Sequence, residues 1–94
     1  MAGLPAVIAL DTNLLVYAHR ERAPEHAEVA AALMRVSRKQ TGWGFPLPVI
    51  SEFWRVVTHP AIPGGPSSPR QAGAFLQGLR EAGALCWLPL PGFE

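Results

Sequence analysis

The hydrophobic pattern of the chain begins with a short apolar run at residues 6–10, which read AVIAL. The run ends at the polar residues Asp11, Thr12 and Asn13. A continuous run of branched apolar side chains is typical of a strand buried on both faces of a parallel sheet. All three polar residues are favourable helix N-caps, so a helix is expected over residues 14–20. The start of the chain therefore predicts a strand followed directly by a helix.

The rest of the pattern predicts three more helices and two more strands. Val29, Leu33 and Val36 recur at helical spacing, and Pro24 suits a first helical position, so a helix is expected from residue 24 to about residue 40. Ser68 and Gln71 fit a capping box at the start of another helix. The remaining expected elements are a strand at 42–45, a helix from 46 to about 58, a helix from 69 to about 83, and a strand at 84–88.

Composition limits the chain to one folded domain. Among 94 residues, 49% are hydrophobic, and two linked domains would each be too small for a core that outweighs chain entropy. The net charge of +1 does not indicate a nucleic-acid or membrane partner. The first ten residues lack the charged start of a signal peptide, and no run is long enough to span a bilayer. A cytoplasmic protein is therefore expected.

The first candidate for chemistry is Asp11, the only Asp among seven acidic residues. It is placed at the carboxyl end of the first expected strand, where open α/β sheets bind ligands. Thr12 and Asn13 could orient this carboxylate or a metal-bound water. The alternative is that the triplet only caps the following helix.

The second candidate is Glu52, which lies at the rim of the apolar face of the helix expected from 46 to about 58. At this position a carboxylate can reach a cleft at the end of the sheet while its neighbours pack. Hard divalent cations such as Mg²⁺ prefer several oxygen ligands. Asp11 and Glu52 are thus candidate metal ligands, although a glutamate on a helix border is often only solvated.

Three other residue types are interpreted as structural. No spacing places two histidines on one helix face as metal ligands, so all are expected at the surface or at helix caps: His19, His26 and His59. The tryptophans lie within apolar runs and are expected in the core: Trp43, Trp54 and Trp87. The single cysteine, Cys86, has apolar neighbours and is expected to be a buried structural thiol.

Two motifs carry a family resemblance. Residues 7–13 read VIALDTN and residues 49–60 read VISEFWRVVTHP, with a proline-bearing helix entry between them. This order resembles the N-terminal part of a PIN domain, especially in the VapC-type toxins of toxin–antitoxin pairs. The resemblance implies a three-layer α/β/α sandwich with a parallel sheet, and an endoribonuclease that uses Mg²⁺ or Mn²⁺ to cleave RNA.

The resemblance also assigns roles to residues of the candidate site. Asp11 and Glu52 match catalytic, metal-ligating positions, and Thr12 and Asn13 match supporting positions. The family completes its site with one or two Asp residues in a C-terminal strand and helix, which this chain lacks because Asp11 is its only Asp. Residues 1–94 are therefore expected to form a single, C-terminally truncated PIN domain that lacks the C-terminal strands and is inactive as it stands.

The resemblance implies partners as well. An RNA substrate and a VapB-type antitoxin are expected, and a membrane is not. In the family the first strand pairs with strands from the C-terminal part, so residues 7–10 are expected to present an open apolar edge here. Such an edge favours a homodimer or a partner that adds strands.

Two alternatives remain at this point. The chain could be a non-catalytic PIN remnant that binds an antitoxin or an intact toxin protomer without cleaving RNA. It could also carry a phosphatase-like nucleophile, with Asp11 attacking phosphate, although Asn13 stands where that motif has a second acid.

Overall fold

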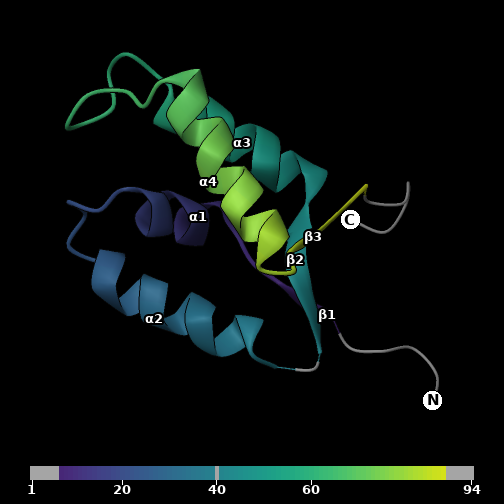
Figure 1. The fold of residues 1–94 in the computed structure, drawn as a ribbon. Helices are drawn as coiled ribbons and strands as arrows, with labels where there is room; N and C mark the ends of the chain where they lie inside the picture. Colours follow the sequence, from purple (N-terminus) through teal and green to yellow (C-terminus); the bar gives the residue numbers. More distant parts are fainter. Residues whose placement is uncertain (1–6, 40, 89–94) are drawn as a thin grey trace.

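The structure is a computed structural model that describes residues 7–39 and 41–88. Seven elements follow one another, and each corresponds to an expected strand or helix (Figure 1). They are β1 (Val7–Ala9), α1 (Thr12–His19), α2 (His26–Ser37), β2 (Gly42–Pro46), α3 (Leu47–Val57), α4 (Pro69–Glu81) and β3 (Leu85–Trp87).

The three strands form a parallel sheet in the order β1-β2-β3, with Ile8 opposite Trp43 and Phe45 opposite Cys86. Both crossovers connect neighbouring strands in the same direction along the sheet. Right-handed connections of this kind place their helices on one face, and Figure 1 shows the helices to one side of the strands. The predicted α/β class with a parallel sheet is confirmed, and the arrangement is compatible with a PIN-like α/β/α fold.

The core lies between the central strand and the helices. Its buried residues come from α1, β2, α3 and α4, and they are Leu15, Trp43, Phe45, Phe53, Val57 and Ala72. Phe53 and Val57 are fully buried, which confirms the apolar face predicted for the helix that carries Glu52. The capping box predicted at the start of α4 is also present, because the Ser68 side chain accepts from the backbone N–H of Gln71 and the Gln71 side chain accepts from that of Ser68.

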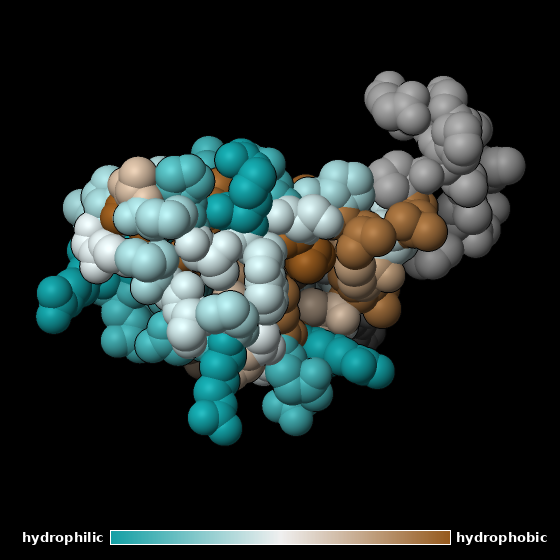
Figure 2. All heavy atoms as spheres, turned by 90° about the horizontal axis from the view of Figure 1, so that it is seen from above, coloured by the Kyte–Doolittle hydropathy of each residue, from teal (hydrophilic) through white to brown (hydrophobic). Residues whose placement is uncertain are grey.

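The prediction that the first strand is buried on both faces is wrong for the described residues. Ile8 is half-buried on the helix face, but Val7 is 46% exposed and Ala9 is exposed on the other face. Leu85 on β3 is 50% exposed for the same reason, because no described helix covers this second face. Figure 2 shows hydrophobic atoms gathering beside the grey atoms, toward the end of the molecule where the strands lie.

Three further expectations need correction. Cys86 is exposed, not buried, because β3 is an edge strand and the space between it and α4 is an open groove of about 460 Å³. Trp54 is 38% exposed at the border of the apolar face of α3, whereas Trp43 is buried as predicted. The helix predicted from Pro24 begins two residues later at His26, since the preceding residues form turns.

None of the helices in the described part of the chain is long and apolar enough to cross a membrane.

Candidate functional site

Asp11 lies between β1 and α1, as predicted. Its backbone is extended, and its Oδ1 accepts a hydrogen bond of 3.0 Å from the backbone N–H of Leu14. The carboxylate is therefore the N-cap of α1, which also places its negative charge at the positive end of the helix dipole. The residue is exposed, and within the described ranges no hydrogen bond reaches Oδ2. Capping therefore uses one oxygen and leaves the other for a ligand.

Thr12 and Asn13 form the first turn of α1. Thr12 is half-buried and Asn13 is exposed. Neither side chain is hydrogen-bonded to Asp11 in the part of the chain that the structure describes. Their supporting role remains a prediction.

Glu52 lies in the middle of α3 and its side chain is 45% exposed. Both carboxylate oxygens face the guanidinium of Arg55, three residues later, with distances of 2.5 Å from Nη2 to Oε1 and 3.3 Å from Nε to Oε2. The hydrogen bond to Glu52 raises the pKa of Arg55 above its ordinary value. Because the Arg55 side chain is 64% exposed, water screens the ion pair and it adds little to stability.

Asp11 caps α1 and Glu52 lies in α3, and these two helices pack against each other. No hydrogen bond or ion pair joins Asp11 to Glu52 within residues 7–39 and 41–88. The same residues contain no group of three or more His, Cys, Asp or Glu side chains that could hold a metal ion. Their oxygen donors suit a hard cation, but they do not form a complete site for Mg²⁺ or Mn²⁺.

The structure shows a second polar cluster, which the sequence did not predict. Nε2 of His19, at the end of α1, lies 2.8 Å from Oγ of Ser67, in the loop before α4. Arg20 donates to the same Oγ at 3.4 Å and to the backbone carbonyl of Pro63 at 2.7 Å. The expectation that His19 is a simple surface or capping residue is therefore wrong. The paired residues are 48 positions apart, and no local pattern in the sequence indicates such a contact.

Aromatic rings hold His19 in place. Its ring centroid lies 5.4 Å from that of Phe53 and 4.9 Å from that of Phe75. Burial against these rings lowers the pKa of His19 below its ordinary value of 6.5, and the charge of Arg20 lowers it further, while Glu21 acts in the opposite direction. Neutral His19 is therefore the form that the fold favours.

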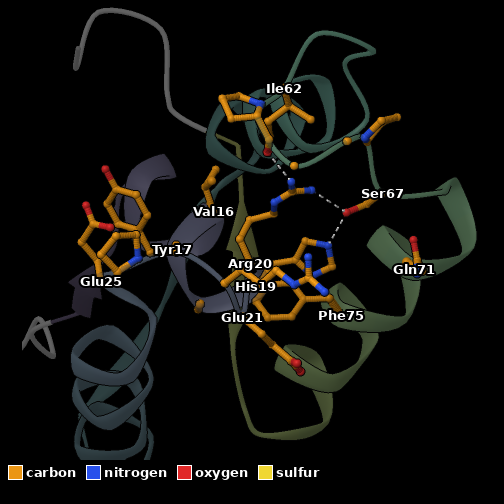
Figure 3. A pocket seen from close by; sticks show the side chains of 18 of the residues that line it. Val16, Tyr17, His19, Arg20, Glu21, Glu25, Ile62, Ser67, Gln71 and Phe75 are labelled. Atoms are coloured by element: carbon orange, nitrogen blue, oxygen red, sulfur yellow. Dashed lines mark hydrogen bonds between the residues drawn. The ribbon is translucent and has the colours of Figure 1, made fainter.

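An open cleft of about 1260 Å³ lies beside this cluster. It is lined mainly by residues 16–25 and 62–67, with Gln71 and Phe75 from α4. Figure 3 shows Arg20 and His19 directed toward Ser67, with Tyr17 and Glu25 lying apart from them. The cleft is at the C-terminal end of α1, whereas Asp11 is at the N-terminal end. It is therefore separate from the predicted metal site.

The lowered pKa of His19 predicts that the free energy of unfolding depends on pH. The unfolded chain binds a proton on this side chain near pH 6.5, and the folded chain binds it only at lower pH. Stability from neutral His19 is therefore fully present above about pH 6.5 and is lost as pH falls through the folded-state pKa. In urea unfolding measured between about pH 5 and pH 7.5, the free energy of unfolding should fall less with decreasing pH in His19→Gln than in the wild type.

His59→Gln is the matched control, because it replaces an exposed histidine that lies outside the cluster with the same residue. An equal loss of stability with falling pH in the wild type and in His19→Gln would show that His19 does not cause it.

Comparison with known proteins finds curated relatives of one kind. No known family profile matches it. Two curated relatives, VapC ribonuclease Mb2897 of Mycobacterium bovis and ribonuclease VapC43 of Mycobacterium tuberculosis, are each 36% identical over 78 residues. The match covers 83% of this chain and 53% of each relative, so the chain spans about half the length of the curated relatives it matches. Over those 78 residues the chain is similar to VapC-type ribonucleases, which confirms the resemblance that its motifs predicted.

Proposed function

We propose that these residues form the front part of a VapC-type toxin, a metal-dependent endoribonuclease that acts in the cytoplasm and cleaves RNA phosphodiester bonds. The observation that carries the proposal is the similarity to relatives named as VapC ribonucleases. The position of Asp11 at the carboxyl end of β1 supports it, because ligand sites of parallel sheets occur there. A VapB-type antitoxin is the proposed partner.

Within this proposal, Asp11 and Glu52 are the catalytic, metal-ligating carboxylates. Thr12 and Asn13 support Asp11 from the first turn of α1. The hydrogen bond from Leu14 fixes Oδ1 and so orients the carboxylate. The described residues bring no third carboxylate, histidine or cysteine to Asp11 and Glu52, so further ligands for Mg²⁺ or Mn²⁺ would come from elsewhere in the same polypeptide or from a second chain.

The proposal predicts that the isolated 94-residue chain has no metal-dependent ribonuclease activity above background. Asp11 and Glu52 offer too few ligands to hold a hard cation against its hydration shell in a reactive geometry. Cleavage of a labelled RNA by the pure chain is compared with and without Mg²⁺ or Mn²⁺. Robust metal-dependent cleavage that disappears in Asp11→Ala would contradict this expectation.

A second candidate function is binding without catalysis, to an antitoxin or to a toxin protomer. The open edge of β1 favours it, because this strand has one neighbour in the described sheet and carries exposed Val7. An unpaired strand edge is a template for another strand, so a homodimer or a strand-adding partner is part of this proposal. Formation of a complex with an intact VapC protomer, with no gain in RNA cleavage over that protomer alone, would favour binding over catalysis.

A further inference from the structure

The proposed ribonuclease function leaves the cluster of His19, Arg20 and Ser67 unused. This cluster and Asp11 lie at opposite ends of α1, which is eight residues and therefore about 12 Å long. Its three side chains come together from two segments of the chain at the wall of the open cleft. The proposed metal site at Asp11 therefore does not account for this cluster.

The direction of the hydrogen bonds follows from the chemistry of the partners. A guanidinium can only donate, so Arg20 gives a hydrogen to Oγ of Ser67. The hydroxyl hydrogen of Ser67 is then free to point at Nε2 of His19, 2.8 Å away. This separation is within the range seen between a nucleophilic serine and its histidine base.

The surroundings favour the reactive forms of both groups. Packing against Phe53 and Phe75 keeps the ring of His19 in a fixed position, and the lowered pKa keeps Nε2 free to accept a proton. The charge of Arg20 lies next to Oγ, where it would stabilise the negative charge of an ionised hydroxyl. The open cleft gives a small molecule access to this wall.

An anion site at the start of α4 explains the cluster less well. The capping box already uses two of the backbone N–H groups there, those of Ser68 and Gln71. Pro69, the first residue of α4, has no N–H to offer. Little donor capacity is left at this helix terminus for an anion, whereas the hydroxyl of Ser67 remains paired with a base.

We propose that Ser67, activated by His19 and assisted by Arg20, is a nucleophile that accepts acyl groups from small activated esters entering the cleft.

The reaction is an acyl transfer. Oγ of Ser67 attacks the ester carbonyl carbon and forms a new C–O bond, while its proton moves to Nε2 of His19. The bond from the carbonyl carbon to the leaving oxygen breaks, and the proton on Nε2 passes to that oxygen. The products are acylated Ser67 and the free alcohol or phenol. In the described part of the chain no hydrogen bond orients Nδ1 of His19. We therefore expect each Ser67 to be acylated once, without rapid removal of the acyl group and repeated turnover.

The test uses p-nitrophenyl acetate and the full 94-residue chain carrying Cys86→Ala, because the exposed thiol of Cys86 would also react. Peptide mapping by mass spectrometry locates the acetyl group, and release of p-nitrophenolate gives the rate. We expect acetylation at Ser67, its loss in Ser67→Ala, and a rate at least about 100-fold lower in His19→Gln. Ser37→Ala, which removes a hydroxyl bonded to the carbonyl of Met34, is the matched control and should leave acetylation of Ser67 unchanged.

A purely structural role for the cluster predicts different results. No acetyl group on Ser67 in the folded chain, or equal rates with and without His19, would overturn the proposal. If His19→Gln does not fold, as judged by circular dichroism, the pH profile of the chain with His19 decides the matter. The acetylation rate should rise with pH and level off, with a midpoint below 6.5, and a rate without such a step would also overturn the proposal.

Discussion

Replacing Gly44 with alanine should unfold most of the protein. Gly44 lies in β2, the central strand, opposite Leu85 of β3, and its φ of +156° is rarely adopted by other residues. A Cβ atom built at this position would lie 2.0 Å from the backbone oxygen of Leu85 and 2.6 Å from its nitrogen. Both contacts are with backbone, so no side-chain rotation relieves them. The two strands would have to separate.

The separation would also reach the core, because Trp43 and Phe45 on either side of Gly44 are both buried. We expect a loss of more than about 4 kcal/mol, which is comparable to the whole stability of a small domain. Thermal unfolding followed by far-UV circular dichroism measures the effect.

Gly78→Ala is the matched control for this substitution. Gly78 lies inside α4, and a Cβ atom there would meet nothing within 4 Å. Alanine is favoured over glycine in a helix interior, so this variant should gain up to about 1 kcal/mol. A folded Gly44→Ala chain with the stability of the wild type would show that β2 and β3 do not pair in this register.

The order of elements could be predicted because local signals determine it. The apolar run before Asp11, the capping box at Ser68 and the prolines before α3 each act within a few residues. The same is true of Asp11 itself, whose role as N-cap depends only on the N–H of Leu14 three residues later. Such contacts are encoded by neighbouring residues and can be recognised in the sequence.

Burial was harder to predict, because it depends on which elements cover a given face. The run around Val7 has the composition of a strand buried on both faces, but the described helices all cover one face. Cys86 and Trp54 have apolar neighbours in sequence and are nevertheless exposed, one on an edge strand and one at a helix border. Their exposure depends on tertiary packing alone.

The cluster at His19 could not be predicted for a related reason. Its partner Ser67 is in a loop rich in proline and glycine, and only the packing of α1, α3 and α4 brings the two side chains together.

Glu52 was predictable only in part from the sequence. Its position at the rim of the apolar face was predicted from helical spacing, but its pairing with Arg55 was not.

The second large effect is expected from Asp11→Asn, in a form of the protein that can complete the site. A chimera that joins these 94 residues to the remaining part of the Mycobacterium tuberculosis relative provides such a form. Asparagine can still cap α1, because its amide oxygen accepts the hydrogen bond from Leu14, but it lacks the negative charge that a divalent cation requires. We therefore expect an intact fold and a loss of activity of at least about 100-fold.

Glu81→Gln is the control for the loss of one negative charge, because Glu81 is exposed at the end of α4 and should not affect activity. The most direct test of the ribonuclease assignment is then the rate of Mn²⁺-dependent RNA cleavage by the folded chimera and its two variants. We expect cleavage by the chimera and by Glu81→Gln, and almost none by Asp11→Asn. Equal cleavage by Asp11→Asn, or no cleavage by a chimera that circular dichroism shows to be folded, would contradict it.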